Sequence, residues 1–395
     1  MESFYRPTRV EISLDALYHN IRAFRHYLPE PIHLMAVIKA DAYGHGAVQV
    51  AREAITCGVD YLAVAFLDEA LELRRAGVSA PILVLGHTPV NGISLAAENN
   101  ISLTVYSDEA LDAIARRPQG VPPVTIHIKI DTGMGRIGLN CLEDASAFVS
   151  RALSLPGVKV EGLYTHYACA DECDKTFTLE QHSKLKAVVD HFADKGITFP
   201  YIHAGNSAAA IDTPELTYNM VRLGIGMYGL YPSENVGKEQ IQLQPVMSIK
   251  TGVVMLKPVP LDSGISYGHR YRTKREGEMI ATLPVGYADG YSRMLTGKVQ
   301  ALIKGQRVPV VGTICMDQCM IDVSDIAGAA LGDEVVILGR QGEEMISAEE
   351  LAAGLGTLNY EIVCMISHRV PRVYTRNGRA VYTVNHLRHE MDTME

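Results

Sequence analysis

Eight short apolar segments rich in β-forming residues recur along the first part of the chain. Helical segments lie between them, with acidic starts and apolar residues every three or four positions, as in "DEALELRRAG" from Asp68 and "DEALDAIARR" from Asp108. Strands joined by helices run parallel, and eight such units can close on each other, so the pattern predicts a TIM-type (β/α)8 barrel. The predicted strands occupy residues 32–40, 61–66, 81–86, 101–107, 124–131, 158–167, 201–206 and 220–226.

The pattern changes beyond Tyr231. From about residue 243 strands dominate, as in "EMIATLPVGY" and "VQALIKGQRVPVVG", with tight turns between them and little helix. A chain of 395 residues also exceeds what one hydrophobic core usually fills. We therefore expect an α/β protein with two domains, a barrel over residues 1–242 and a mostly β domain over residues 243–395.

Composition excludes several classes of protein. Hydrophobic residues make up 47% and charged residues 21% of the chain, which is typical of globular proteins. The net charge of -9 and the absence of a basic run argue against nucleic acid as a partner. No apolar run approaches the roughly 20 residues that a membrane helix needs. Seven cysteines without a CxxC pair predict reduced thiols and no metal site, and the N-terminus lacks an export signal, so we expect a cytoplasmic protein.

Polar side chains gather where the predicted strands end. The first strand ends at Lys39, with Tyr43 four residues on, and the sixth ends at His166. Arg136 follows the fifth strand, and Arg222 lies in the eighth. Each alone could be a surface charge or a structural residue. Because active sites of these barrels lie at the carboxyl ends of the strands, the coincidence predicts a site at this rim.

The loops after the last two strands suggest what binds there. Ser207 offers a hydroxyl, and Gly224 and Ile225 offer backbone N–H groups, a combination that fits a phosphate site. The alternative is a pair of tight turns. A phosphate site opposite Lys39 suggests pyridoxal 5'-phosphate held as a Schiff base, because partial burial lowers the pKa of a lysine and makes it nucleophilic.

Lys129 presents a separate problem. Strand periodicity in "VTIHIKID" places it on the same face as His127 and Asp131, pointing into the barrel. A buried ammonium must be paired, neutralised or altered. We therefore expect either an internal salt bridge with an acid such as Asp131, or a carbamylated Lys129 that orients Arg136.

The sequence resembles the bacterial alanine racemases over nearly its whole length. The resemblance is carried by long motifs in the family's order: "AVIKADAYGHG", "DTGMGRIG", "HYACAD", "HAGNSAA", "VRLGIGMYG", "GISYGH", "VGYADGY" and "TICMDQ". It implies alanine as the substrate and a homodimer with shared active sites. Lys39 would be both the Schiff-base lysine and one proton-transfer base, and Tyr267 of a second subunit would be the other. We expect nearby cations, with His166 and Arg222 as candidates, to favour the Tyr267 phenolate.

The resemblance also implies binding roles. Arg222 would face the pyridine nitrogen, with His166 in the same network. Arg136 and the backbone N–H of Met316 would bind the substrate carboxylate, and Arg136 would also contact the phenolic oxygen of the cofactor. Tyr287 and Tyr360 would narrow the entrance. The phosphate would be held by Tyr43, Ser207, Gly224, Ile225 and Tyr360, with Asn206 nearby.

Three other functions remain open. A decarboxylase on the same scaffold needs an acid opposite the pyridine nitrogen, which Arg222 argues against. A racemase for serine or basic amino acids needs a roomier entrance than Tyr287 and Tyr360 suggest. A non-catalytic, single-barrel cofactor carrier has neither a β domain nor a second base.

Overall fold

The computed structural model describes residues 4–118, 120–388 and 390–393. The chain forms two compact units. The barrel unit comprises Leu17–Ala42 and Gly46–Gln244, and the β unit comprises Met1–Ala16, Tyr43–His45 and Pro245–Glu395. This division differs from a single boundary after residue 242, because the first residues of the chain and a three-residue segment after Lys39 group with the β unit.

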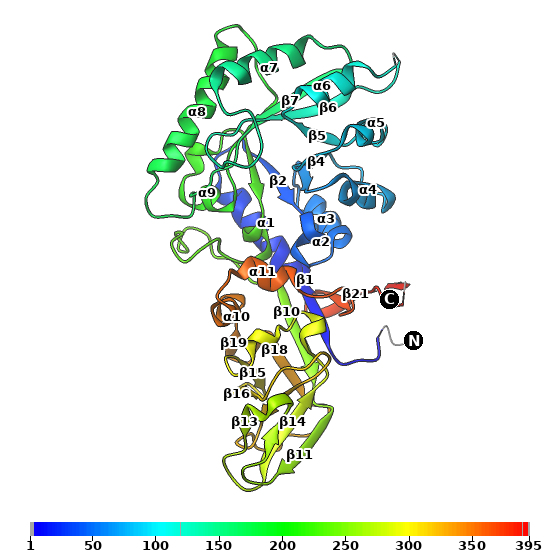
Figure 1. The fold of residues 1–395 in the computed structure, drawn as a ribbon, viewed down its shortest axis with the longest axis vertical. Coiled ribbons are helices and arrows are strands. Elements are labelled where there is room, and N and C mark those ends of the chain that lie inside the picture. Colours follow the sequence, from blue (N-terminus) through cyan, green and yellow to red (C-terminus); the bar gives the residue numbers. More distant parts are fainter. Residues whose placement is uncertain (1–3, 119, 389, 394–395) are drawn as a thin grey trace. The chain divides into compact units, whose positions relative to one another are not determined.

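The barrel unit contains all eight predicted strands, and every pairing between them is parallel (Figure 1). The hydrogen-bonded order is β8-β7-β6-β5-β4-β3-β2-β9. The observed strands are shorter than predicted at their carboxyl ends. They are β2 (His33–Val37), β3 (Tyr61–Val64), β4 (Ile82–Val84), β5 (Ser102–Val105), β6 (Val124–Lys129), β7 (Val158–Tyr164), β8 (Tyr201–His203) and β9 (Met220–Leu223).

The barrel closes between β8 and β9 through a few individual bonds. The Arg222 N–H donates to the Gly205 carbonyl at 3.1 Å. The Asn219 side chain accepts the Ile202 N–H at 2.7 Å and donates to the Pro200 carbonyl at 2.8 Å. These bonds complete a TIM-type barrel, as the sequence predicts.

Helices alternate with the strands and bury one apolar face against them. In α1 (Leu14–Tyr27), Leu17, Ile21 and Phe24 are fully buried at helical spacing. The Ser107 hydroxyl caps α6 (Asp108–Ala115) by accepting the Ala110 N–H. The remaining α-helices are α3 (Ala47–Thr56), α4 (Leu67–Arg75), α5 (Ile93–Glu98), α7 (Leu142–Ser154), α8 (Thr176–Ala193) and α9 (Ser207–Asp212). The segment α2 (Lys39–Tyr43) is a left-handed turn.

The β unit is built on a twelve-stranded sheet with the order β11-β14-β17-β16-β15-β18-β10-β1-β20-β21-β22, and β19 pairs with β18. Its helices are α10 (Ala348–Leu355) and α11 (Asn359–Cys364). The strands are β1 (Arg9–Ser13), β10 (Met247–Gly252), β11 (Met255–Val259), β14 (Glu278–Leu283), β15 (Gln300–Ile303), β16 (Gln306–Val311), β17 (Cys319–Asp322), β18 (Glu334–Gln341), β19 (Glu344–Ile346), β20 (Arg372–Arg376), β21 (Arg379–Asn385) and β22 (Glu390–Thr393), and β12 (Gly264–Ile265) pairs with β13 (Tyr271–Arg272) in a separate ribbon.

Strand β1 was not predicted from the sequence. It pairs antiparallel with β10, where Val10 lies opposite Ile249, and parallel with β20, where Val10 lies opposite Arg372. All other ladders in this sheet are antiparallel. The mostly antiparallel character of the second domain is thus confirmed, and the start of the chain belongs to its sheet.

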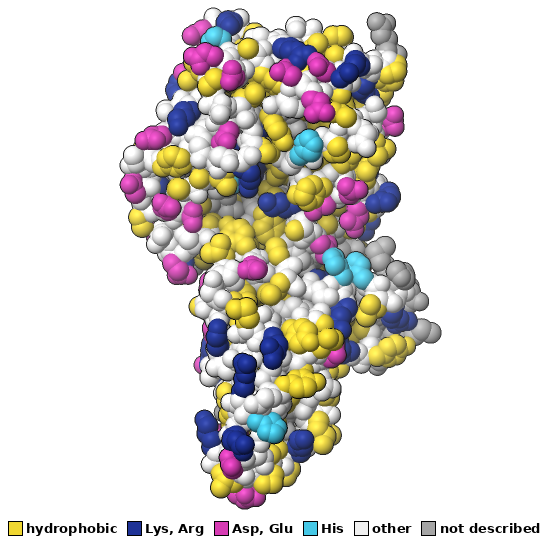
Figure 2. Space-filling view, viewed as in Figure 1, with side chains coloured by type: hydrophobic (Ala, Val, Ile, Leu, Met, Phe, Trp, Pro, Cys, Tyr) yellow, Lys and Arg dark blue, Asp and Glu magenta, His cyan; other side chains and the backbone are white. Residues whose placement is uncertain are grey.

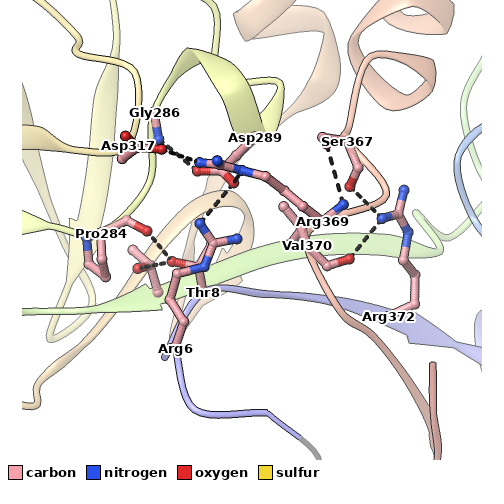
Figure 3. Close-up of polar contacts among 11 residues, drawn as sticks. Arg6, Thr8, Pro284, Gly286, Asp289, Asp317, Ser367, Arg369, Val370 and Arg372 are labelled. Atoms are coloured by element: carbon pink, nitrogen blue, oxygen red, sulfur yellow. Dashed lines mark hydrogen bonds and ion pairs between the residues drawn. The ribbon is translucent and has the colours of Figure 1, made fainter. Parts of the chain in front are cut away.

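A buried charge cluster organises one end of this sheet (Figure 3). The Asp289 carboxylate is 1% exposed and accepts hydrogen bonds from Arg6 at 2.8 Å, Arg369 at 2.7 Å and the Gly286 N–H at 3.0 Å. Nearby, the buried Arg372 guanidinium donates to four backbone carbonyls, those of Gly44, Ile366, Ser367 and Val370. The hydrogen bond from the Gly286 N–H to Asp289, together with its two arginine partners, holds the turn at Tyr287–Asp289.

Within the described ranges, no helix is both long and apolar enough to cross a membrane. On the face shown in Figure 2, acidic and basic side chains are interspersed over the barrel unit. No group of three or more potential metal ligands occurs among the described residues.

Candidate active site

Lys39 stands at the start of an unusual turn after β2. Residues 40–43 all have φ between 52° and 54°, which makes one left-handed turn without glycine. Each non-glycine residue in this region costs about 1–2 kcal/mol. The Glu69 carboxylate accepts the Ala40 N–H at 2.7 Å, and the Asp41 carboxylate accepts the Ala47 N–H at 2.7 Å. Strained turns of this kind persist where the surroundings hold them, and they cluster at functional sites.

Arg222 on β9 lies beside the strand that leads to Lys39, because β9 pairs with β2 with Met35 opposite Arg222. Its guanidinium is buried and contacts the Thr165 carbonyl at 2.9 Å, the Ala204 carbonyl at 3.0 Å, and two histidines. Burial lowers the pKa of Arg222 to about 10. The group therefore remains a cation at neutral pH, fixed by several acceptors.

His166 follows β7, and its Nδ1 lies 3.0 Å from the Arg222 guanidinium. Burial, followed by the charge of Arg222, holds the pKa of His166 well below its ordinary value of 6.5. An imidazole that accepts from a guanidinium through Nδ1 carries its proton on Nε2. His166 is therefore neutral, and the expectation that it supplies positive charge to Tyr267 is wrong.

Lys129 points into the barrel, as its place in the strand pattern predicts. It is 2% exposed, its Nζ donates to the Ile130 carbonyl at 3.2 Å, and it lies 5.0 Å from the centre of the Tyr164 ring. Burial, then the charge of Arg222, lowers its pKa to about 7. The expected salt bridge with Asp131 is not among the ion pairs of the described residues, and the Asp131 carboxylate instead accepts the N–H groups of Gly133 and Gly135 at 3.1 Å.

Arg136 lies exposed in the loop after β6. Its charge contributes, after burial and Arg222, to the lowered pKa values of Lys129 and His166. The rim of the barrel thus carries one neutral imidazole and four cationic or potentially cationic side chains, those of Lys39, Lys129, Arg136 and Arg222.

The loop that we predicted to bind phosphate is closely packed. The Ser207 hydroxyl accepts the N–H groups of Gly224 at 3.0 Å and Gly226 at 3.2 Å, so the starts of α9 and of the turn at Ile225–Tyr228 lie together. Asn206 caps α9 by accepting the Ala209 N–H at 3.0 Å. Ser207, Gly224 and Ile225 are therefore neighbours, as the sequence predicts, and the Gly224 N–H is bonded to the Ser207 hydroxyl.

The other candidate residues lie in the β unit. Tyr267 and Met316 line one open cleft of about 690 Å³, together with Lys257, His269 and Asp317. The Tyr267 side chain is 71% exposed.

Hydrogen bonds hold the segments around this cleft. The Ser266 hydroxyl donates to the Thr313 carbonyl at 2.6 Å, and the Thr313 hydroxyl donates to the Tyr267 carbonyl at 2.8 Å. The Tyr287 N–H donates to the Cys315 carbonyl at 3.0 Å, next to Met316. A Cβ at Gly286 would lie 2.3 Å from the Cys315 oxygen, so only glycine allows this approach.

Tyr43 and Tyr360 form a second group in the β unit. Their ring centroids are 6.2 Å apart. Burial, followed by the neighbouring Tyr360, raises the pKa of Tyr43 well above its ordinary value. Tyr43 is therefore a neutral hydrogen-bonding phenol.

Sequence reasoning missed the residues behind Arg222. His203 on β8 contacts the guanidinium through Nδ1 at 2.8 Å, and His127 on β6 contacts His203 at 2.9 Å. One signal was present, since the pattern of "VTIHIKID" places His127 on the inward face with Lys129.

Comparison with known proteins gives a consistent result. Residues 12–232 match the model of the alanine racemase N-terminal domain, and residues 246–374 match that of the C-terminal domain. An alanine racemase from Clostridium perfringens is 46% identical over 98% of this chain and 100% of its own length.

Solved structures agree with these matches. The alanine racemase from Bacillus anthracis with bound L-Ala-P is 42% identical, with a TM-score of 0.92 over 98% of this chain and 100% of that one. A histidine racemase from Leuconostoc mesenteroides is 30% identical, with a TM-score of 0.87 over 95% of this chain and 100% of that one.

Proposed function

Since this chain belongs to the alanine racemase family, which interconverts L- and D-alanine, we propose that Lys39 and Tyr267 are its two proton-transfer bases and that pyridoxal 5'-phosphate is its cofactor. A racemase must remove a hydrogen from one face of a carbon and return one to the other face. Two bases, one on each side, meet this requirement. An amine at a strand end and an exposed phenol are suitable groups.

The donor groups of the barrel rim fit the cofactor. Its phosphate is an anion. The N-terminal ends of α9 and of the helical turn at Ile225–Tyr228 lie together, and they supply the Ser207 hydroxyl and backbone N–H groups with partial positive charge. We propose that Gly224, Tyr43 and Tyr360 also bind the phosphate, with Asn206 nearby. Lys39 would carry the cofactor through its Nζ. When bound, pyridoxal phosphate acidifies the α-hydrogen of an amino acid and accepts the electron pair left behind.

Arg222 would set the electronic character of the site. Its guanidinium would face the pyridine nitrogen and, because it stays protonated, would keep that nitrogen unprotonated. The neutral His166 restrains the guanidinium from one side. A pyridine ring with an unprotonated nitrogen would be a weaker electron sink, which disfavours side reactions such as transamination. This also argues against a decarboxylase function for the protein.

Substrate binding would involve both units. Arg136 would bind the substrate carboxylate and the phenolic oxygen of the cofactor, and Met316 would offer its backbone N–H to the same carboxylate. Tyr287 and Tyr360 would limit the size of the side chain that enters. We also propose that Lys129 is carbamylated, because its lowered pKa leaves much of the amine neutral at neutral pH and therefore reactive toward carbon dioxide.

We further propose that the protein is a cytoplasmic homodimer that supplies D-alanine for peptidoglycan. In this dimer Tyr267 and Met316 would complete the active site of the partner subunit. The exposure of Tyr267 on the rim of an open cleft supports this arrangement.

A second substrate class is kept open by one observation. A solved relative of similar fold is a histidine racemase, so the scaffold accommodates a larger amino acid in that protein. A cofactor carrier, by contrast, leaves the β unit and Tyr267 without a role.

An activity panel tests the proposal. The holoenzyme is offered the L-amino acids one at a time, and chiral chromatography detects the D-products, while borohydride reduction and peptide mapping locate the bound cofactor. We expect D-alanine as the main product and the label on Lys39. A label on Lys39 without any racemisation would favour the cofactor carrier. D-histidine as the main product would show that histidine, not alanine, is the substrate.

A further inference from the structure

A chain of hydrogen bonds leads from Arg222 away from the proposed cofactor site and across the barrel interior. Arg222 on β9 contacts His203 Nδ1 on β8 at 2.8 Å, and His203 Nε2 contacts His127 Nδ1 on β6 at 2.9 Å. His127 Nε2 then contacts the Glu161 carboxylate on β7 at 3.4 Å. Both histidines are fully buried, whereas the Glu161 side chain is 15% exposed. The chain therefore joins an interior cation to an acid near solvent.

The chemistry of the two ends fixes the direction of every bond in this chain. A guanidinium only donates, so as long as His203 keeps its hydrogen bond to Arg222 its Nδ1 accepts and its proton lies on Nε2. His203 Nε2–H then donates to His127 Nδ1. The remaining proton of His127 lies on Nε2 and points at Glu161. Burial lowers the pKa of both histidines, which keeps them neutral and leaves one proton on each ring.

Glu161 is held as a carboxylate. Tyr61 donates to it at 2.8 Å and Lys159 donates at 2.9 Å. Although burial raises its pKa, the hydrogen bonds from His127, Lys159 and Tyr61 lower the pKa of Glu161 to about 2. A neutral histidine chain thus ends on a permanent negative charge.

Close packing leaves the imidazoles little freedom. The Tyr164 ring stacks on His203 with centroids 4.6 Å apart and an interplanar angle of 9°. The Tyr201 ring stacks on His127 at 6.1 Å and 11°. A Cβ at Gly162 would lie 2.4 Å from His127 Nδ1, so the backbone of β7 leaves room for the ring only because this residue is glycine.

We propose that Glu161 is a positioning residue for Arg222. Its carboxylate accepts the outermost N–H of the chain and, together with Arg222, stabilises the Nε2–H tautomers of His127 and His203. In these tautomers His203 Nδ1 accepts a guanidinium N–H and holds Arg222 from behind. The assignment rests on the proposed function in one respect, that Arg222 faces the cofactor. The chain of contacts itself is independent of that function.

Tautomers provide the direct test. Holoenzyme labelled with ¹⁵N-histidine is examined by long-range ¹H–¹⁵N NMR, with His127→Gln and His203→Gln used only to assign signals. In the wild type we expect both rings to carry the proton on Nε2. In Glu161→Leu we expect signals of the Nδ1–H tautomer to appear, whereas Glu161→Gln keeps the wild-type pattern because its amide oxygen still accepts.

Two results would overturn the proposal: a proton on Nδ1 of His203 in the wild type, or a Glu161→Leu spectrum identical to that of the wild type. If Glu161→Leu does not fold, Glu161→Ala, which also removes the acceptor for His127 Nε2–H, takes its place in the same comparison. An inactive wild-type holoenzyme would instead contradict the proposed function. The tautomer assignment would still be tested by the NMR spectrum alone.

Kinetics supply the second readout. A hydrogen bond to a charged group stabilises its partners enough to change a rate measurably when it is lost. We therefore expect Glu161→Leu to lower kcat for alanine roughly tenfold, with a smaller change in KM. The absorbance of the bound cofactor should shift as well. Lys159→Gln is the matched control, because it removes the exposed ion-pair partner of Glu161 and leaves His127 in place. Equal losses in Glu161→Leu and Lys159→Gln would show that only the surface ion pair mattered.

Discussion

The protonation states of individual residues in the site depend on burial rather than on their place in a motif. Lys129 and His166 both lose positive charge because they are buried beside Arg222. The motifs predicted which residues gather at the rim, and the structure brings Ser207 and Gly224 together as expected. They could not predict protonation, since a strand pattern specifies which face a side chain occupies but not which charges surround it.

Lys129 gives a prediction at this scale. A neutral amine adds to carbon dioxide, forming an N–C bond and releasing one proton, to give a carbamate. We expect protein equilibrated with ¹³C-bicarbonate at pH 8 to show one carbamate signal, because the pKa of Lys129 is about 7.

The signal should be absent from Lys129→Met and present in Lys159→Met, since Lys159 lies on the surface. Retention of the signal in Lys129→Met would assign it to another amine. No signal in the wild type would leave Lys129 as an unmodified amine and contradict the proposal.

Secondary-structure elements were predicted well where their signal is local. All eight barrel strands follow from short apolar runs, and α6 begins at the predicted Asp108. Strand β1 was not predicted, because its partners β10 and β20 lie more than two hundred residues away in the sequence. The left-handed turn after Lys39 was also missed. Residues 40–43 include no glycine, so the sequence gives no sign that their φ angles are positive.

The strands of the barrel carry buried histidines, which predicts how stability depends on pH. Burial holds the pKa values of His127, His203 and His166 below 6.5 in the folded protein. Below about pH 6.5 the unfolded chain therefore binds more protons than the folded chain, and the free energy of unfolding must fall as pH falls. Each histidine contributes at most roughly 1.4 kcal/mol per pH unit.

Urea unfolding of the protein at pH 7.5, 6.5, 5.5 and 5.0 checks this. We expect a constant free energy near neutral pH and a steady decline below it. His26→Gln should show the same profile, because His26 is exposed on α1. A stability that does not change between pH 6.5 and 5.0 would mean that the buried histidines become protonated without cost.

At the scale of the whole molecule, the proposed catalytic groups belong to different units. Lys39 lies in the barrel unit, whereas Tyr267, Met316 and Tyr360 lie in the β unit. The sequence predicted both units but placed the first sixteen residues in the barrel, because nothing local distinguishes a strand that joins a distant sheet.

Shared sites in a homodimer predict complementation between inactive variants. Mixed dimers of Lys39→Ala and Tyr267→Phe chains would have one site that lacks both bases and one site with both. Random reassociation makes half of the dimers mixed, so about a quarter of wild-type activity should return.

The measurement is racemisation after the two variants are unfolded and refolded together, with each variant refolded alone as the control. Recovery near a quarter supports a Tyr267 that acts in the partner's site. No recovery, with mixed dimers demonstrated by differently tagged chains, would place both bases in one chain.

We propose that Lys39 and Tyr267 act on opposite faces of the same carbon, and α-hydrogen exchange in D₂O distinguishes the two faces. Tyr267→Phe holoenzyme is incubated with L- and D-alanine separately, and Tyr382→Phe, which alters a tyrosine on β21, is the matched control. If Tyr267 is one of the two bases, deuterium enters one enantiomer only, without inversion, and racemisation is lowered by roughly 10²-fold or more. Deuterium in both enantiomers, with racemisation near the wild-type rate, would contradict it.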